Sequence, residues 1–299
     1  MDRSRIEGHV KPLLGKKHVA SLTPKDIDQF VRDVRAGKSK PVTKDSVRKR
    51  GGVVEGGPGA AARTYGMLRT ILQHAVQERI IEANPARDIS AKPKDTAKRL
   101  PYRAEDVAAL GKALREAEVE GENKIALRAI RLLLLTGCRR MEVLSLTWGE
   151  VDRTKRCLRL SDTKSGAQAR PLGSAANALL ASFEPEEAKP ADCVFPGGGK
   201  GGHFIGLPKV WERVAKRAGI EGVSLHGLRH WFASAAAEMN FSELTIAGMI
   251  GRRVKGVTAR YATTPDRALL AAADAVSTAL RAALGEAEDA RVLQIAAHA

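Results

Sequence analysis

Tyr261, one of only three tyrosines in the chain, stands in the cationic stretch GMIGRRVKGVTARYATTPD (residues 248–266). A tyrosine in a protein core has apolar neighbours, and a tyrosine on the surface needs no arginines around it. Arg252 precedes it by nine residues. Cations beside a phenol bind an anionic group and stabilise the phenolate, and a tyrosine that attacks a phosphate requires both effects. Tyr261 is therefore a candidate nucleophile.

Arg139 lies in TGCRRME, where a Thr-Gly break ends one helical pattern and an amphipathic turn follows. An arginine at the start of a helix opposes the helix macrodipole, so the position is unfavourable unless an anion is bound nearby. Glu142 follows three residues later, at a spacing that allows an ion pair with Arg139. The segment is therefore a candidate anion site in which Glu142 fixes the orientation of Arg139.

A third cationic group lies in SLHGLRHWFAS. Its His226, Arg229 and His230 share one helical face through i,i+3 and i,i+4 spacing. Metal binding is not expected here, because the metalloprotease pattern requires a glutamate after the first histidine and Gly227 stands at that position. The face is predicted to bind an anion, with His230 in a supporting or packing role.

No metal ion or cofactor is expected elsewhere in the chain. The glycine-rich FPGGGKGGHF contains Gly-Lys but lacks the spacing and the Ser/Thr of a P-loop. The cysteines are odd in number and too scattered for a zinc site or a disulfide framework, so we expect them to be small buried side chains. They are Cys138, Cys157 and Cys193.

The elements that must position these residues begin with two helices. In SLTPKDIDQFVRDVRAG, Thr23 is the expected N-cap and Pro24 the first helical residue. A longer helix is predicted in AAARTYGMLRTILQHAVQERII, and residues 38–59 before it, basic and then glycine-rich, indicate a flexible loop. The predicted apolar stripe of the longer helix consists of Met67, Ile71, Leu72 and Ala75.

In the second half of the chain, the spacing of apolar residues changes once from the helical period to the alternation of a strand. Residues 157–160 and 169–172 alternate on either side of the turn TKSGAQ, which predicts a small antiparallel hairpin with Lys164 at its tip. Helical patterns are predicted near residues 104–119, 122–135, 174–183, 208–218, 225–238, 242–250 and 256–262. The tail from Pro265 carries an apolar stripe of Leu269, Ala273, Val276, Leu280 and Leu284. The predicted fold is mainly α with a small antiparallel β-sheet.

The charge favours a polyanionic partner. Fifty Lys and Arg against 34 Asp and Glu give a net charge of +16. Residues 1–100 hold 22 basic and 11 acidic residues, or +11, and the rest of the chain holds 28 and 23, or +5. Contacts between these cations and phosphates would supply most of a salt-dependent affinity for nucleic acid. No apolar run reaches the roughly 18 residues of a membrane span, and the first residues lack the apolar core of a secretory signal, so we expect a cytoplasmic, DNA-associated protein without membrane contact.

Taken in order, four of these segments resemble the boxes of the tyrosine recombinase (phage integrase) family. TGCRRMEVLSLTW is similar to its first arginine box, DTKSGAQARPL to its lysine hairpin, HGLRHWFAS to its His-x-x-Arg box and IGRRVKGVTARYA to its nucleophile box. Upstream, ARTYGMLRTILQHAVQERIIEANPARDI is similar to the helical core-binding domain of the same family. One box alone is a weak signal, but four in colinear order over most of the chain are specific.

The resemblance implies a helical core-binding domain over residues 1–90, a basic linker over 91–103, a mixed α+β catalytic domain over 104–264 and a tail helix over 265–299. It also implies a metal- and ATP-independent reaction through a 3′-phosphotyrosyl intermediate at Tyr261. The family has a histidine or tryptophan where this chain has Arg252, and this difference puts the efficiency of the site in question. The implied catalytic residues are Arg139, Lys164, His226, Arg229, Arg252 and Tyr261, supported by Glu142 and His230.

The implied partners are double-stranded DNA, further copies of the chain (a dimer on a site and a tetramer in synapsis) and accessory DNA-bending proteins. The tail helix either packs on a neighbouring protomer or docks on its own chain. Two other functions stay open. Arg252 suits a weakened or inactive integrase remnant that only binds DNA, and a nicking-closing enzyme of the type IB topoisomerase kind shares the chemistry.

Overall fold

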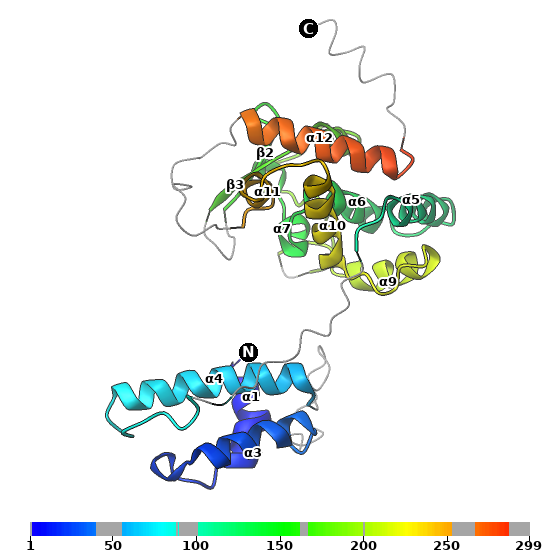
Figure 1. Ribbon diagram of the computed structural model, residues 1–299. Coiled ribbons are helices and arrows are strands. Elements are labelled where there is room, and N and C mark those ends of the chain that lie inside the picture. Colours follow the sequence, from blue (N-terminus) through cyan, green and yellow to red (C-terminus); the bar gives the residue numbers. More distant parts are fainter. Residues whose placement is uncertain are drawn as a thin grey trace, which may run out of the picture. The chain divides into compact units, whose positions relative to one another are not determined.

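The computed structural model describes residues 2–39, 56–87, 89, 101–161, 167–199, 201–252 and 267–286. The chain divides into two compact units, Met1–Lys98 and Arg99–Ala299, each with its own hydrophobic core (Figure 1). The division falls inside the predicted basic linker. None of the described helices is both long and apolar enough to cross a bilayer.

The first unit is built from helices. α3 (Pro24–Arg35) begins as the sequence predicts: the Thr23 hydroxyl accepts from the backbone N–H of Asp26, the Asp26 carboxylate accepts from the backbone N–H of Thr23, and Pro24 is the first helical residue. The apolar side of α3 packs on α4 around Phe30 and Leu68. The helices of this unit are α1 (Asp2–Arg5), the π-helix η1 (Ile6–Val10), α2 (Lys11–Leu14), the 3-10 helix η2 (Val19–Ser21), α3 (Pro24–Arg35) and α4 (Pro58–Gln77).

The apolar stripe predicted for α4 is partly wrong. Leu72 and Ala75 are buried, but Met67 is half-buried and Ile71 is 43% exposed. The buried side follows Tyr65, Leu68 and Leu72, and the Tyr65 hydroxyl lies within hydrogen-bond distance of the carbonyl oxygens of Ala86 and Ile89, near the end of the unit. Ile71 therefore points away from the core.

The second unit is mainly α with one three-stranded sheet, as expected for the fold class. Its helix bounds agree with the predicted segments to within three residues wherever both are described, and the segment predicted near 256–262 lies outside the described residues. Its elements are α5 (Ala104–Val119), α6 (Lys124–Thr136), α7 (Arg140–Leu144), the 3-10 helix η4 (Trp148–Glu150), β1 (Val151–Asp152), β2 (Cys157–Leu160), β3 (Gln168–Pro171), α8 (Ser174–Ala181), α9 (Leu207–Arg217), α10 (Leu225–Glu238), α11 (Glu243–Ile250) and α12 (Arg267–Ala283).

The sheet has the order β1-β2-β3 and is antiparallel throughout. β2 and β3 form the predicted hairpin, in which Leu158 is paired with Arg170 and Leu160 with Gln168. Leu158 and Leu160 are buried, and side chains of paired residues lie on the same face of a sheet, so Arg170 shares the inward face with them. A charged side chain therefore occupies a core position of this hairpin.

α6 is the central helix of the second unit. The Asn123 side chain caps its start by accepting from the backbone N–H of Ala126, and it ends at Gly137, which adopts a left-handed conformation with φ of 60°. Gly137 has no room for a side chain, because a Cβ there would lie 2.7 Å from the ring of Phe232 on α10. α6 contacts α5, α7, α8, α9, α10 and α12. The predicted Thr-Gly break is the end of this helix, and the chain leaves the core there.

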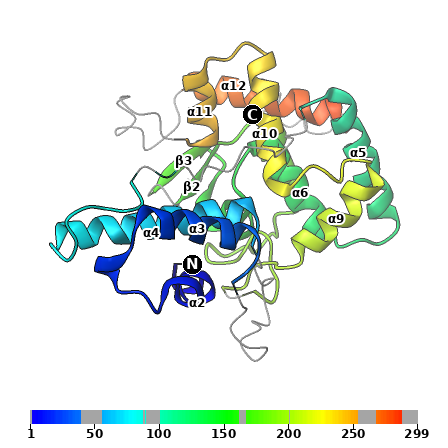
Figure 2. The same ribbon diagram turned by 60° about the horizontal axis from the view of Figure 1, so that its bottom comes forward.

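α12 packs on its own unit. It contacts α5, α6, α8, α10, α11 and β3, and Figures 1 and 2 both show it beside α10 and α11. The predicted stripe is buried there: Val276, Leu280 and Leu284 have no exposed surface, and Leu269 is partly buried. The apolar face that suggested docking on a neighbouring protomer is therefore already covered within one chain.

Candidate active site

The turn between α6 and α7 presents Arg139. This residue precedes α7 with an extended backbone, and its own backbone N–H donates to Oε2 of Glu142 at 2.8 Å. Its guanidinium Nη1 donates to Oε1 of the same carboxylate at 2.6 Å. The ion pair expected from the three-residue spacing forms through Oε1, and the backbone hydrogen bond occupies Oε2, so Arg139 uses both oxygens of Glu142. Arg139 is consequently held in one orientation.

Arg229 reaches the same turn from α10. Ser224 caps that helix by accepting from the backbone N–H of Gly227, and Arg229 lies in its second turn, only 7% exposed. Its Nη1 donates to the carbonyl oxygen of Gly137 at 2.8 Å, two residues before Arg139. The packing of α10 on α6 therefore brings together two arginines that are 90 residues apart in sequence.

A third arginine, Arg170, belongs to this group and was not predicted. It is 1% exposed, and its Nη2 donates to Oε1 of Glu142 at 3.2 Å. One signal in the sequence could have revealed it. The sequence predicts a strand over residues 169–172, and an arginine in register with the apolar residues of the neighbouring strand lies on the same face of the sheet as they do. We call Arg139, Arg170, Arg229 and Glu142 the arginine cluster.

The arginine cluster carries more positive than negative charge. Three guanidinium groups face one carboxylate, which leaves a net charge of +2. Burial, together with the positive charges of Arg139 and Arg170, lowers the pKa of Arg229 to about 10, so it is still protonated at neutral pH. Burial alone would raise the pKa of Glu142, but the backbone hydrogen bond of Arg139 and the charges of Arg170 and Arg139 outweigh it and lower that pKa. A net cationic group that is largely buried is suited to an anion.

The two predicted histidines lie on the exposed side of α10. The rings of His226 and His230 meet edge to face with centroids 5.0 Å apart, which agrees with their i,i+4 spacing. Arg229 differs from them, because its side chain turns into the protein rather than staying on the exposed face. The prediction that all three side chains share one face thus holds for His226 and His230, which contact each other, but Arg229 is buried. Among the described residues, no group of three His, Cys, Asp or Glu side chains is arranged to hold a metal ion.

The remaining predicted residues follow the ends of β2 and α11. Lys164 and Tyr261 lie outside the described residues. Arg252 is exposed, and its backbone N–H donates to the carbonyl oxygen of Ala247 at 2.8 Å, directly after α11 ends at Gly251. Gly251 is left-handed with φ of 61°, and a Cβ built there would lie 0.8 Å from Nη1 of Arg170. The chain segment that leads to Tyr261 thus starts in contact with the arginine cluster.

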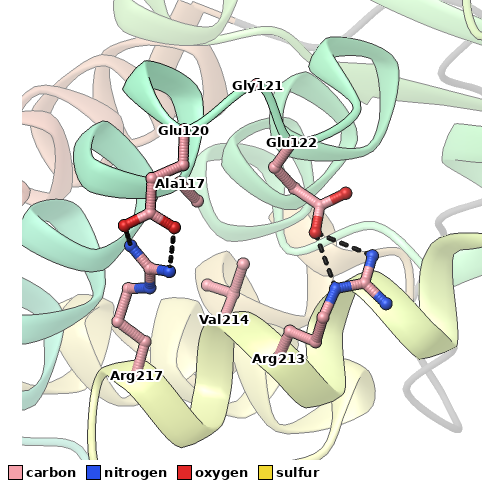
Figure 3. A pocket seen from close by; sticks show the side chains of 7 residues that line it. All are labelled: Ala117, Glu120, Gly121, Glu122, Arg213, Val214 and Arg217. Atoms are coloured by element: carbon pink, nitrogen blue, oxygen red, sulfur yellow. Dashed lines mark hydrogen bonds and ion pairs between the residues drawn. The ribbon is translucent and has the colours of Figure 1, made fainter.

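A surface pocket between the end of α5 and α9 holds a different kind of charge group (Figure 3). Glu120 accepts from both terminal nitrogens of Arg217, and Glu122 accepts from the guanidinium of Arg213 at 2.7 Å. Each arginine here has its own carboxylate, and none of the predicted site residues lines the pocket. The arginine cluster differs because its one carboxylate, Glu142, pairs with both Arg139 and Arg170, and Arg229 donates to a backbone carbonyl oxygen instead.

The second unit is thus mainly helical with a small antiparallel sheet and carries a net cationic cluster of the kind that suits an anion. A profile of the phage integrase family matches residues 102–267, more than half of the 299 residues, and the chain therefore belongs to the phage integrase family. The resemblance inferred from the four boxes is confirmed.

Individual relatives agree with the family assignment. The chain is 28% identical over 265 residues to tyrosine recombinase XerC of Corynebacterium efficiens, covering 86% of this chain and 80% of that protein. It is 29% identical over 142 residues to prophage integrase IntF of Escherichia coli K12, covering 46% of this chain but only 30% of IntF.

Two solved structures share the fold. One contains residues 75–356 of lambda integrase as a dimer bound to a COC′ core site, with a TM-score of 0.59 and 16% identity over 85% of this chain and 86% of that chain. The other is the Tn1549 transposon integrase in complex with circular intermediate DNA, with a TM-score of 0.58 and 17% identity over 87% of each chain. The predicted fold class is thereby confirmed.

Proposed function

We propose that this protein is a site-specific DNA recombinase of the integrase type that cleaves and rejoins DNA through a 3′-phosphotyrosyl intermediate at Tyr261. The observation that supports this most strongly is the charge of the arginine cluster, in which Glu142 is the one carboxylate among three guanidinium groups and is bound by two of them, Arg139 and Arg170. A phosphodiester, with one negative charge, would offset part of that charge, and the remaining excess would stabilise the further negative charge of the transition state. In phosphoryl transfer, negative charge is spread over the non-bridging oxygens of the transition state, and planar guanidinium donors such as those of Arg139 and Arg229 match these oxygens. The reaction then needs no metal ion to stabilise the charge.

The proposed reaction exchanges one phosphate ester bond for another. The bond between the Tyr261 oxygen and phosphorus forms, and the bond from phosphorus to the 5′ oxygen breaks. His226 assists loss of the phenol proton or holds a phosphate oxygen, and Lys164 protonates the leaving 5′ oxygen, because a free tyrosine has a pKa of about 10 and an alkoxide leaves poorly. The ester energy stays in the covalent intermediate, so rejoining needs no ATP.

Three further residues complete the proposed site. Glu142 orients Arg139, and His230 supports His226 through the ring contact. Arg252 occupies the place of the histidine or tryptophan of the family, where its guanidinium donates to a non-bridging phosphate oxygen. It cannot accept a proton, so its proposed role is restricted to donation.

We propose double-stranded DNA and further copies of this chain as partners. Lambda integrase has been solved as a dimer on a core site and as a tetramer on a Holliday junction. By analogy, this protein would form a dimer on one site and a tetramer when two sites are paired, aided by accessory DNA-bending proteins. The bacterial-type cytoplasm is the expected place of action.

The test is formation of a covalent protein–DNA adduct. Duplexes would be selected from a randomised pool by binding to the protein, remade with a nick near each candidate phosphate, and scored for an adduct that survives denaturation. We expect the wild-type protein and Tyr102→Phe to form the adduct and Tyr261→Phe to form none. Tight DNA binding by the wild type without any adduct would instead identify a DNA-binding protein that does not cleave.

The same assay tests Arg252. If Arg252 is a competent donor, Arg252→Ala lowers the rate of adduct formation by about 10-fold or more, and Arg252→His brings no gain over the wild type. A rate that rises in Arg252→His would mean that this arginine weakens the enzyme.

A further inference from the structure

Arg170 carries a buried charge that packing alone does not explain. It faces inward from β3, 1% exposed, opposite Leu158. Its Nε has no hydrogen-bond partner among the described residues, and the carboxylate with which it pairs is already bound twice by Arg139. Apolar side chains of similar volume commonly replace buried ion pairs without loss of stability. A buried arginine that is incompletely satisfied therefore needs a reason other than stability.

Its contacts join three separate segments of the proposed site. Arg170 belongs to the hairpin whose turn contains Lys164, and its Nη2 donates to Glu142, which orients Arg139. Its Nη1 occupies the space where a side chain of residue 251 would stand, so the guanidinium packs on the backbone at the end of α11. Arg252 follows directly. The lysine hairpin, the first arginine and the start of the nucleophile segment thus meet at one guanidinium.

We infer that Arg170 is a positioning residue of the recombinase site, which fixes Arg139 through the shared carboxylate of Glu142 and holds the end of α11 through Gly251. The inference rests on the proposed function. The second hydrogen bond to Oε1 restrains the carboxylate that aims Arg139. The contact with Gly251 sets the point from which the chain leads to Arg252 and Tyr261. Arg170 itself is too buried to touch a DNA phosphate.

The first test replaces Arg170 by methionine, which has a similar length and no charge. We expect the single-turnover rate of adduct formation on nicked DNA to fall about 10- to 100-fold, as small misplacements in an active site do. DNA affinity should stay near that of the wild type. Arg170→Lys keeps the charge without the planar fork and should recover part of the rate. A wild-type rate in Arg170→Met would overturn the inference.

Arg131→Met is the matched control. Arg131 is also a buried arginine of the second unit, 7% exposed, and it pairs with Glu118 and Glu286 away from the arginine cluster. Its replacement should lower the melting temperature and leave the adduct rate unchanged. If it slows cleavage as much as Arg170→Met does, general destabilisation explains both losses and the inference fails.

A double-mutant cycle tests whether Arg170 acts through Glu142. If it does, Arg170→Met combined with Glu142→Gln loses no more rate than the more impaired single variant, because both changes disable the same support of Arg139. Losses that multiply would show two independent roles and contradict the inference.

A second readout keeps this inference separate from the proposed function. Inorganic phosphate should raise the melting temperature of the wild type by binding at Arg139 and Arg229, and Arg170→Met should reduce that rise while Arg131→Met keeps it. If phosphate raises the melting temperature of the wild type but no adduct forms on DNA, the recombinase reaction is refuted. The comparison of the rise in the wild type and in Arg170→Met still tests the role of Arg170. An equal rise in Arg170→Met and the wild type would refute the positioning role.

Discussion

Both oxygens of the Glu142 carboxylate are in use. Oε2 accepts from the backbone N–H of Arg139, and Oε1 accepts from the guanidinium groups of Arg139 and Arg170. Its side chain is 7% exposed, so these are contacts in a largely dry environment where a charge without partners is strongly disfavoured. Glu142 thereby allows two arginines to stand side by side, and the stability of the site depends on its ionisation.

Replacing Glu142 by glutamine should make this dependence visible. The lowered pKa of Glu142 means that the folded state favours the carboxylate, so its contribution is complete above the ordinary value of 4.5 and is lost as the pH falls through the lowered pKa. We expect Glu142→Gln to reduce the free energy of unfolding by about 2 kcal/mol at neutral pH. Denaturant titrations at decreasing pH should show the two proteins converging below 4.5. A difference that stays constant with pH would contradict this origin.

Among the elements, α12 is anchored in its first half by Asp274. Asp274 accepts from both terminal nitrogens of Arg156 at 2.8 Å and from the backbone N–H of Ser174 at 2.7 Å. These bonds tie α12 to the chain just before β2 and to the start of α8. At its other end, Arg115 donates to the carbonyl oxygen of Leu284 at 2.5 Å. α12 is thus fixed at both ends over the apolar face that it covers.

Asp274→Asn should therefore cost more stability than loss of an isolated surface pair. The matched comparison is Glu184→Gln, which removes one hydrogen bond from Arg153, because the two carboxylates are equally exposed at 32%. We expect a loss of about 1–2 kcal/mol for Asp274→Asn and less than about 0.5 kcal/mol for Glu184→Gln. Thermal unfolding measures both, and equal losses would show that Asp274 does not anchor the helix.

The elements were more predictable from the sequence than the site. Periodicity and turn residues located the helices and the hairpin because these signals are local, as with Thr23 before α3 and Gly137 after α6. The burial predicted for Ile71 is wrong because the buried side of α4 runs through Tyr65, Leu68 and Leu72, and the side that a helix buries depends on tertiary packing. Arg170 was missed for the same reason, since its importance depends on the convergence of β3, α7 and α11. The pairing of Arg139 with Glu142 was predictable because three residues separate them.

At the scale of the whole molecule, positive charge has two forms. Residues 1–100 carry +11 and the remainder +5. In the second unit many arginines are neutralised by their own carboxylates, as between α5 and α9 (Figure 3), whereas the arginine cluster keeps an excess of +2. Diffuse charge gives affinity for a phosphate backbone, and a preorganised excess selects one phosphate for reaction. In the proposed function, affinity and chemistry would therefore be carried by different basic residues.

The position of α12 also decides which part of the tail is available to a neighbouring protomer. A protein cut at Thr264 would lose Val276, Leu280 and Leu284 from its own core, so it should misfold rather than report on assembly. A cut after Glu286 keeps the ion pair of Glu286 with Arg131 at 2.6 Å. It removes residues 287–299, which we propose as the part that contacts the next protomer.

We expect the protein cut after Glu286 to melt at the wild-type temperature, because every described contact of α12 is retained. It should bind a single site normally and fail to form the slower-migrating complexes on paired sites, since head-to-tail contacts close a ring only when every protomer supplies one. Native gels and light scattering on DNA with one or two sites measure this. The control is the same cut combined with Glu286→Gln, which should lower the melting temperature by loosening α12. Normal assembly by the protein cut after Glu286 would show that the tail is not exchanged.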